Sequence, residues 1–326
     1  MPSEFELIDR HFASVAAQAA DVVLGLGDDC ALVQPPASDE LLANSTDTLV
    51  EGVHFLPDIA AEDLAWRLVS ASVSDLAAMG ARPLWFSLAI TLPDGNDAWL
   101  AAFSRGLKAA LKAYSITLIG GDTTSGATRV LTAHVQGAVK PEQALKRSGA
   151  QVGDLIFVSG TLGDSRAGLE LLSHAVDSAD YEFLTQRFLR PTARVELGRG
   201  LTQLASAAID ISDGLLADLS HILKASGVGA LVHLEQLPLS DSLAALYSEE
   251  QSQEWAATGG EDFELCFTAP AGRRDEIQLL AKELGLELTC IGEIRSENGL
   301  QVLSQGEPWA VSGAKGFDHF GEEESL

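Results

Sequence analysis

The chain has 326 residues, which at the usual size of about 150 residues per domain predicts two domains, each able to bury a hydrophobic core. Lysine and arginine number 21 against 47 aspartates and glutamates, which gives a formal net charge of −26. Because so acidic a surface repels phosphate backbones and anionic lipid, we expect neither a nucleic-acid nor a membrane partner. The same charge would repel a phosphorylated small substrate unless cations are recruited.

Composition and cysteine usage indicate a globular cytoplasmic protein. Hydrophobic residues make up 46% of the chain, and no run reaches the roughly 18 apolar residues that a membrane span needs. Residues 1–10 lack the basic and then apolar pattern of a signal peptide. The three cysteines, Cys30, Cys266 and Cys290, are too scattered for a disulfide framework or a metal site, so we interpret them as packing residues.

The first 140 residues mix strand and helix patterns. Between Leu84 and Leu92, an apolar residue at every second position alternates with Trp85, Ser87, Ala89 and Thr91, as in a strand whose two faces pack differently. Apolar residues at helical spacing follow from Trp99 to Leu111. In chain order we expect a strand-like run at 41–44, a helix at 63–79, a strand at 84–92, a helix at 99–111, and strands at 116–119 and 128–139. This mixture predicts an α+β layer structure.

The sequence turns polar and basic between Lys140 and Gly153, which predicts a domain boundary. We therefore expect an N-terminal domain at 1–140 and a C-terminal domain at 141–326. In the second half we expect a strand at 155–159, helices after Asp164 and after Pro191, and strands near 230–234, 264–268, 288–294 and 300–303.

Familiar nucleotide and metal motifs are absent from the sequence: there is no P-loop, no protein-kinase motif set and no HExxH zinc motif. Aspartate recurs instead in small, turn-rich settings. These are GDD at 27–29, STDT at 45–48, SDL at 74–76, GGDTT at 120–124, DISDG at 210–214 and GGED at 259–262. Taken singly, each is also typical of an ordinary turn or helix N-cap.

Asp75 is harder to explain as a turn residue. On an ideal helix it lies between Leu64 and Leu68 on the apolar face, whereas Arg67, Ser70 and Ser74 mark the polar side. A buried carboxylate needs a cation partner, since leaving it unpaired costs several kcal/mol. A metal ion is one candidate partner.

Asp47 and Asp122 each follow a strand-like run, and we expect both at strand ends, where sites gather. Carboxylate and hydroxyl ligands favour a hard cation, Mg²⁺ before Zn²⁺. Several such carboxylates imply several ions, as phosphoryl transfer between two anions would require. His54, shortly after Asp47, is a candidate ligand-binding residue or an ordinary packed histidine. The loop at 160–164 either cradles an anion with its N–H groups or forms a plain tight turn.

Together these stretches resemble the thiamine-monophosphate kinase family, whose superfamily includes aminoimidazole ribonucleotide synthetase, selenophosphate synthetase and a hydrogenase maturation factor. The resemblance runs from about Phe5 to Phe320, and its most specific stretches are LGLGDDCAL, STDTLVEGVHF, SDLAAMGARP, LIGGDTT, KRSGA, IDISDGL, GGEDFEL and KGFDHF. It implies a two-domain α/β (α+β) fold like that of aminoimidazole ribonucleotide synthetase. In that fold the N-terminal mixed sheet and helices form a homodimer, the C-terminal domain is α/β, and ATP and metals lie in the cleft between domains.

The resemblance also implies the reaction and its residues. ATP would phosphorylate thiamine monophosphate to thiamine diphosphate with several Mg²⁺ ions. The implied metal ligands are Asp29, Ser45, Thr46, Asp47, Asp75, Asp122, Asp210 and Asp213. ATP would contact Tyr114, Gly121, Asp122, Arg147 and Ser212, and thiamine monophosphate would contact His54, Glu261 and Phe317. Many relatives carry Tyr or Trp at the position of Phe317, so ring stacking is retained here but a hydrogen bond from that side chain is not.

The aspartate-rich motifs of this sequence fit the chemistry that this reaction requires. The acceptor phosphate is already ionised at neutral pH, so we expect no catalytic general base, only positioning of two anions and cancellation of their repulsion. Two alternatives stay open. One is another ATP-dependent synthetase of the superfamily, and the other is a non-catalytic protein that binds divalent cations.

Overall fold

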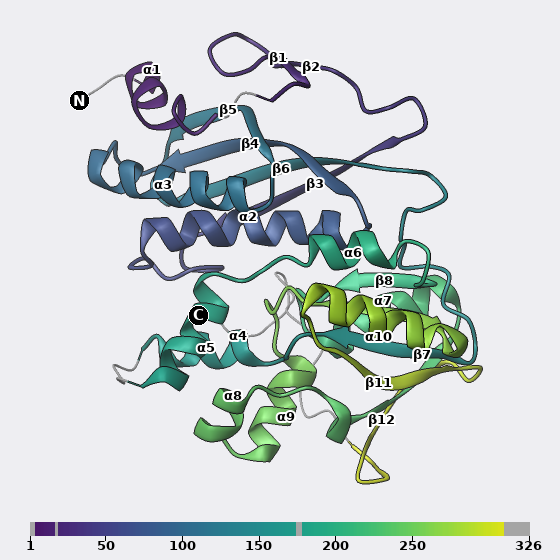
Figure 1. Ribbon diagram of the computed structural model, residues 1–326. Helices are drawn as coiled ribbons and strands as arrows, with labels where there is room; N and C mark the ends of the chain where they lie inside the picture. Colours follow the sequence, from purple (N-terminus) through teal and green to yellow (C-terminus); the bar gives the residue numbers. More distant parts are fainter. Residues whose placement is uncertain (1–3, 17–18, 174–177, 310–326) are drawn as a thin grey trace. The chain divides into compact units, whose positions relative to one another are not determined.

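The computed structural model describes residues 4–16, 19–173 and 178–309, which form two compact units (Figure 1). Unit 1 contains the chain up to Leu76 together with Ala81–Glu142. Unit 2 contains Ala77–Gly80 together with the described chain from Gln143 to Trp309. No described helix combines the length and the apolar character that a membrane span requires.

Unit 1 is built on a four-stranded sheet in the order β3-β6-β4-β5. Strand β6 runs antiparallel to both β3 and β4, and β4 runs parallel to β5. Its elements are α1 (Glu4–Leu7), η1 (Ile8–Phe12), β1 (Val22–Leu24), β2 (Leu32–Val33), β3 (Leu41–Val50), α2 (Ala61–Ala78), β4 (Arg82–Leu92), α3 (Asp97–Ala113), β5 (Thr117–Ser125) and β6 (Val130–Val139).

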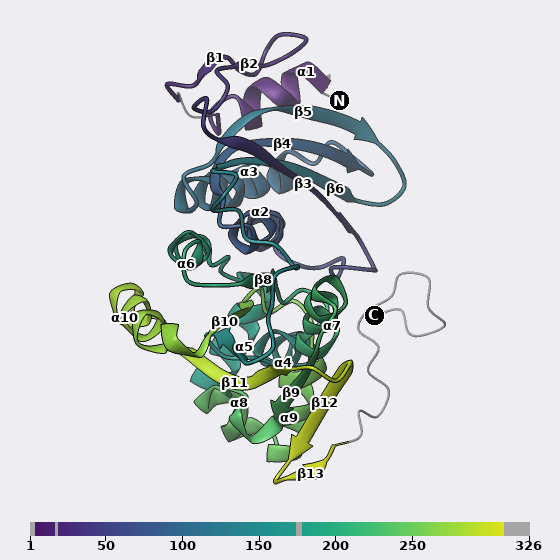
Figure 2. The ribbon, with the colours of Figure 1, turned by 90° about the vertical axis from the view of Figure 1, so that its right-hand side faces the viewer.

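Helices α2 and α3 cover one face of this sheet (Figures 1 and 2). On that face β6 contributes Leu131, Ala133 and Val135, all fully buried, because the alternation of a strand brings every second side chain to the same side. The two helices touch at Gly106 of α3, where an added Cβ would lie 2.2 Å from the carbonyl oxygen of Glu62. Only glycine allows the backbones to approach this closely.

The opposite face of the sheet is polar along much of its length. Thr48 and Thr132 share a hydrogen bond of 2.9 Å, and Thr91 and Thr124 share one of 3.0 Å. The β1–β2 hairpin packs on this side against Trp85, whose indole Nε1–H donates to an Asp21 carboxylate oxygen at 3.0 Å (Figure 2).

Unit 2 is built on a seven-stranded sheet in the order β13-β12-β9-β11-β7-β10-β8, in which β9 and β12 are parallel and the other neighbours antiparallel. Its elements are β7 (Asp154–Ser159), α4 (Asp164–Leu171), α5 (Ala179–Leu189), α6 (Val195–Leu201), β8 (Ala207–Asp210), α7 (Leu215–Ser226), β9 (Gly229–His233), η2 (Leu234–Gln236), α8 (Asp241–Leu246), α9 (Glu249–Thr258), β10 (Leu265–Pro270), η3 (Ala271–Arg273), α10 (Arg274–Leu284), β11 (Leu288–Arg295), β12 (Gly299–Ser304) and β13 (Glu307–Pro308).

The core of unit 2 lies between the sheet and α7. Leu215, Leu219 and Ile222 recur at helical spacing along α7 and are all fully buried against Ile156 and Ile209 of the strands. Helix α7 therefore has a fixed place on the sheet, and so does the turn that precedes it.

The α+β character expected from the sequence is confirmed, and two local expectations need correction. The strand-like runs do not end before Asp47 and Asp122: β3 continues to Val50 and β5 to Ser125, because pairing with β6 and β4 extends both strands. On α2, the side expected to be polar is also inside, since Arg67, Ser70 and Ser74 are fully buried.

Candidate functional site

In unit 1, strand β3 and helix α2 bring together three of the predicted metal ligands. Ser45 Oγ on β3 donates a hydrogen bond to Asp75 Oδ2 on α2. Asp47 is two residues further along β3, so its side chain lies on the same face of the strand as Ser45. Asp47 Oδ2 is buried and accepts no hydrogen bond from any described residue.

Two acidic side chains, Asp47 and Asp75, therefore lie close together, and burial shields the Asp47 carboxylate from water. Burial, followed by the charge of the nearby Asp75, raises the pKa of Asp47 to about 6, and a hydrogen bond from Ser72 opposes the shift. A buried carboxylate oxygen without a partner is costly, and a cation removes that cost. The donors are two carboxylates and a hydroxyl, all hard oxygen ligands of the kind Mg²⁺ prefers, so the residues present fit this ion.

Thr46 lies between Ser45 and Asp47, and its side chain points to the other face of the sheet. Its Oγ1 is 2.8 Å from His134 Nδ1 on β6. A contact from Thr46 to an ion bound at Asp47 would therefore use the backbone carbonyl rather than the hydroxyl.

Asp122 is exposed on β5, the opposite edge strand of the sheet from β3. It pairs with Ala89, and three strand spacings, about 14 Å, separate the two edges. The sheet of unit 1 thus does not place Asp122 beside Asp47. The preceding Gly121 is required by packing, since an added Cβ would lie 1.8 Å from the carbonyl oxygen of Leu88.

The other predicted residues of unit 1 are spread around these strands. Asp29 is exposed in the turn between β1 and β2, and its N–H donates to Asp28 Oδ1 at 2.9 Å. His54 follows β3, and its Nδ1 accepts from the Val50 N–H at 3.1 Å. The Tyr114 hydroxyl lies 2.8 Å from Ser70 Oγ on α2.

In unit 2, Asp210 ends β8, and the turn that carries Ser212 and Asp213 leads into α7. A carboxylate that the sequence analysis missed holds this turn: Asp218 Oδ2 accepts from the N–H groups of Ser212 and Asp213, both at 3.0 Å. Burial, followed by the charges of Asp210 and Asp213, raises the pKa of Asp218 to about 8. Asp218 is buried at the edge of the apolar face of α7, on the same side of the helix as Ile222 one turn later, so the helix-face test that singled out Asp75 would have marked it less clearly.

The GGED stretch lies against this turn. The Glu261 N–H donates to the carbonyl oxygen of Ser212 at 2.8 Å, so the predicted substrate residue and the predicted ATP residue are joined through the backbone. The next residue, Asp262, is 1% exposed, and burial raises its pKa to about 7. Its two carboxylate oxygens accept from the N–H groups of Gly163 at 2.7 Å and Ser165 at 3.1 Å. The loop at 160–164 thus binds an anion, and that anion is the chain's own Asp262.

Two predicted residues stand apart from these clusters. Arg147 is exposed in the loop before β7, and its carbonyl oxygen accepts from Ser226 Oγ at 3.3 Å. Phe317 lies outside the described residues.

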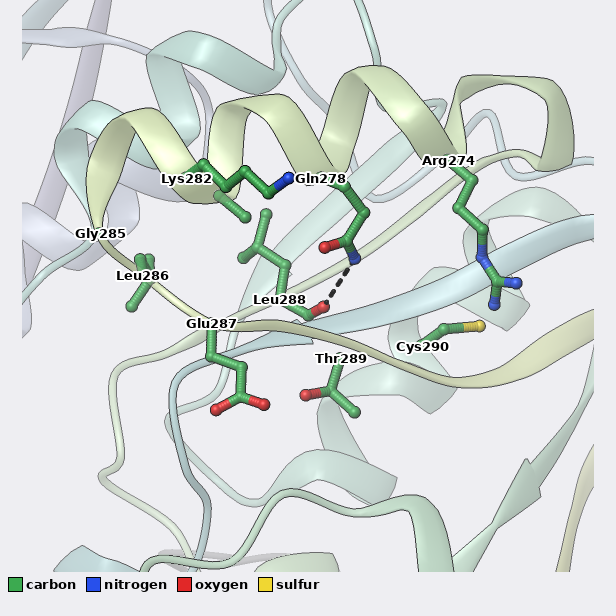
Figure 3. A pocket seen from close by; sticks show the side chains of 10 residues that line it. Arg274, Gln278, Lys282, Gly285, Leu286, Glu287, Leu288, Thr289 and Cys290 are labelled. Carbon is green, nitrogen blue, oxygen red and sulfur yellow. Dashed lines mark hydrogen bonds between the residues drawn. The ribbon is translucent and has the colours of Figure 1, made fainter.

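A surface pocket of about 570 Å³ lies elsewhere in unit 2, between α10 and β11 (Figure 3). Arg274, Gln278 and Lys282 project from the helix, and Thr289 and Cys290 from the strand. None of its lining residues is a predicted site residue. Within the described parts of the chain, no group of three or more His, Cys, Asp or Glu side chains is arranged as a complete metal site.

Comparison with known proteins places these residues in a family. Residues 27–139 match the family model of the AIR synthase related protein, N-terminal domain, and residues 151–304 match that of the C-terminal domain. Thiamine-monophosphate kinase of Haemophilus influenzae is 49% identical over 325 residues, covering 98% of each chain. The Escherichia coli K12 enzyme of the same name is 48% identical over 97% of this chain and 98% of its own.

Solved structures support the same family assignment. The crystal structure of thiamine-monophosphate kinase from Stenotrophomonas maltophilia K279a is 46% identical with a TM-score of 0.86, over 94% of this chain and 97% of its own. AaThiL complexed with AMPPCP and TMP is 35% identical with a TM-score of 0.78, over 97% of both chains. Escherichia coli HypE, a hydrogenase maturation protein, shares the fold at 21% identity and a TM-score of 0.78, over 95% of this chain and 98% of its own. The chain therefore belongs to the AIR synthase related family and, within it, to the thiamine-monophosphate kinases.

Proposed function

We propose that this protein transfers the γ-phosphate of ATP to thiamine monophosphate and so forms thiamine diphosphate, the last step of thiamine diphosphate biosynthesis. The observation that carries this proposal is the match, over nearly the full length of both chains, to thiamine-monophosphate kinases at 48% and 49% identity. A solved relative complexed with AMPPCP and TMP, at 35% identity, supports the same pair of substrates.

The acceptor of this reaction is a phosphate, which is already ionised at neutral pH. The protein therefore needs no strong general base, and its task is to align two anions and to offset their repulsion. We infer that Asp47, Asp75 and Ser45 hold Mg²⁺, because Asp47 Oδ2 is buried with no hydrogen-bond partner among the described residues and Asp75 lies beside it. When bound, Mg²⁺ supplies positive charge to the transferring phosphates.

We assign the roles of the other predicted site residues from their positions in the motifs. Asp29, Thr46, Asp122, Asp210 and Asp213 are proposed as ligands of further Mg²⁺ ions, Tyr114, Gly121, Asp122, Arg147 and Ser212 as ATP contacts, and His54, Glu261 and Phe317 as contacts to thiamine monophosphate. The backbone link between Glu261 and Ser212 supports a common site for the last two groups.

We also propose a homodimer formed by the N-terminal domain. Its support is the sheet of unit 1, in which β3 and β5 are edge strands within the described residues and present open hydrogen-bonding groups. In this proposal residues 1–140 bind metal and ATP, and residues 141–326 add ATP and substrate contacts. A cytoplasmic location stays a prediction from the sequence.

The test is to incubate the protein with ATP, Mg²⁺ and thiamine monophosphate and to assay thiamine diphosphate by chromatography. We expect thiamine diphosphate and ADP in equal amounts. If the protein uses formylglycinamidine ribonucleotide or another acceptor instead, a different reaction of the superfamily is indicated. If Mg²⁺ binds but ATP is not consumed with any acceptor, a non-catalytic cation-binding protein is indicated.

Direct transfer has its own test. Incubation with γ-labelled ATP and Mg²⁺ in the absence of thiamine monophosphate should leave no acid- or base-stable label on the protein. Labelled protein that passes its phosphate to thiamine monophosphate would show a phosphoenzyme and refute direct transfer.

A further inference from the structure

The segment at 259–264, which begins with the GGED stretch, contains two strained residues. Glu261 has φ of 67° and Phe263 has φ of 51°, so the residues on both sides of Asp262 are in the left-handed region. For residues other than glycine this conformation costs about 1–2 kcal/mol each, and it persists only where the surrounding contacts hold the backbone in place. Contacts with neighbouring residues must therefore hold this turn.

The first anchor is Asp262 itself. Its side chain is buried and binds two N–H groups at the beginning of α4, those of Gly163 and Ser165, one with each carboxylate oxygen. Above pH about 7 this carboxyl is ionised, and hydrogen bonds to an ionised acceptor are roughly twice as strong as neutral ones. The two bonds fix the direction of the Asp262 side chain and therefore the backbone between Glu261 and Phe263.

The second anchor is Glu264, which is fully buried. Its carboxylate accepts from Arg194 Nε at 2.6 Å, from Arg187 Nη2 at 2.9 Å and from Ser159 Oγ at 2.5 Å. The turn is thus pinned by a side-chain anchor at its centre and another directly after it, in a region from which water is largely excluded.

The backbone of the turn is also joined to the segment that carries Ser212. Besides the bond from Glu261, the Phe263 N–H donates to the carbonyl oxygen of Ile211 at 2.9 Å, and the Ile211 N–H donates to that of Glu264 at 2.8 Å. A shift of the turn would therefore move Glu261 relative to the residues proposed to bind ATP.

We propose that Asp262 is a positioning residue for substrate recognition: by binding the N–H groups of Gly163 and Ser165 it holds Glu261 in its left-handed conformation, in the place where Glu261 meets thiamine monophosphate. Glu264, held by Arg187 and Arg194, supports the same turn from the other side. This inference rests on the proposed function, in which Glu261 contacts that substrate.

The main test is a double-mutant cycle of Asp262→Asn and Glu261→Ala, read as KM for each substrate. We expect Asp262→Asn to raise KM for thiamine monophosphate about tenfold, which is the effect of losing a charge-assisted hydrogen bond. The KM for ATP should change by about twofold or less. In the Glu261→Ala background Asp262→Asn should add about twofold or less, because it acts through Glu261. Fully additive effects, or an effect on kcat alone, would overturn the proposal.

Asp154→Asn is the matched control. Asp154 is also buried in unit 2, and its Oδ2 accepts from the Gln151 N–H at 2.9 Å and from Ser206 Oγ at 2.6 Å. It should lower the melting temperature as Asp262→Asn does and leave both KM values unchanged. If both variants change KM alike, the effect of Asp262→Asn is general destabilisation and the positioning role is wrong.

A second measurement does not depend on the substrate. Hydrogen–deuterium exchange of the amides at 259–264 in the substrate-free protein should be faster in Asp262→Asn than in the wild type, and should be unchanged in Asp154→Asn. The milder Arg194→Lys, which loses the paired contact with Glu264, should speed the same exchange in case Asp262→Asn does not fold. Unchanged exchange in the anchor variants would refute the positioning role, whereas a wild type that forms no thiamine diphosphate would refute only the proposed function.

Discussion

The hydroxyl of Ser45 donates a hydrogen bond to the carboxylate of Asp75, which joins the middle of strand β3 to the last turns of helix α2 across thirty residues of sequence. The bond fixes the direction of Asp75, whose negative charge contributes to the raised pKa of Asp47. One carboxylate thus sets the electrostatic environment of the other, and both strand and helix are needed to form the pair.

Replacing Asp47 with Asn should remove most turnover and leave the fold intact, because the ligand charge is lost while the volume is kept. We expect kcat/KM to fall about 100-fold or more at ordinary Mg²⁺, the range seen when one preorganised stabiliser of a transition-state charge is removed. Steady-state assays over a range of Mg²⁺ concentrations measure this. Asp58→Asn, at an exposed position of the same unit, is the control and should retain full activity. A fully active Asp47→Asn would contradict the assignment of Asp47 as a metal ligand.

The pH dependence of stability should change in the same variant. The Asp47 pKa is about 6 in the folded protein against 3.8 for an ordinary aspartate, so the carboxyl favours folding below pH about 4. That contribution is lost as pH rises to about 6, a change of about 3 kcal/mol. In EDTA, wild-type protein should therefore lose stability between pH 4 and 6, and Asp47→Asn should lose less. Urea unfolding at several pH values measures this, and parallel curves for the two proteins would refute it.

Asp122→Asn tests a ligand that the sheet of unit 1 holds apart from Asp47. We expect most turnover to be lost here too, with an increased Mg²⁺ requirement, because the exposed carboxylate on β5 is proposed to serve both metal and ATP. Thr124→Val, on the same strand, alters a polar side chain without removing a charge and is the comparison. Full activity of Asp122→Asn at ordinary Mg²⁺ would contradict the metal assignment.

Asp218→Ala should destabilise unit 2. The substitution leaves the N–H groups of Ser212 and Asp213 without their acceptor, at an expected cost of about 1–3 kcal/mol in the free energy of unfolding. Above pH about 8, where Asp218 is ionised, relief of its repulsion with Asp210 offsets part of this cost. Denaturant unfolding measures the change, and Asp241→Ala, at an exposed position of α8, should shift stability by at most a few tenths of a kcal/mol.

Local patterns predicted much of this molecule. The periodicity between Leu84 and Leu92 predicted β4, and the position of Asp75 among the leucines of α2 predicted that it faces inward, where it accepts a hydrogen bond from Ser45. What local patterns could not supply is pairing between distant segments. The GGDTT stretch predicts the end of a strand, because two glycines normally interrupt a strand. In the structure, pairing with β4 extends β5 through Asp122 to Ser125.

Anchors in unit 2 were missed for a related reason. Asp262 and Glu264 occur in a stretch whose composition indicates a turn, and their partners are about 70 to 100 residues away in sequence, at Gly163, Ser165, Arg187 and Arg194. The loop at 160–164 left two interpretations open. Only the fold shows that the anion at its N–H groups comes from the chain itself.

The close contact between Gly106 and Glu62 has a consequence for mutational scans of this protein. A methyl group at position 106 would push α3 away from α2, and α2 carries Asp75 about 20 Å further along its axis. A screen for inactive variants should therefore identify substitutions of Gly106 together with those of the aspartates, although this glycine carries no charge and binds no ligand. Its loss of function would be recognised by a lowered melting temperature, whereas Asp47→Asn keeps its fold and fails only in catalysis.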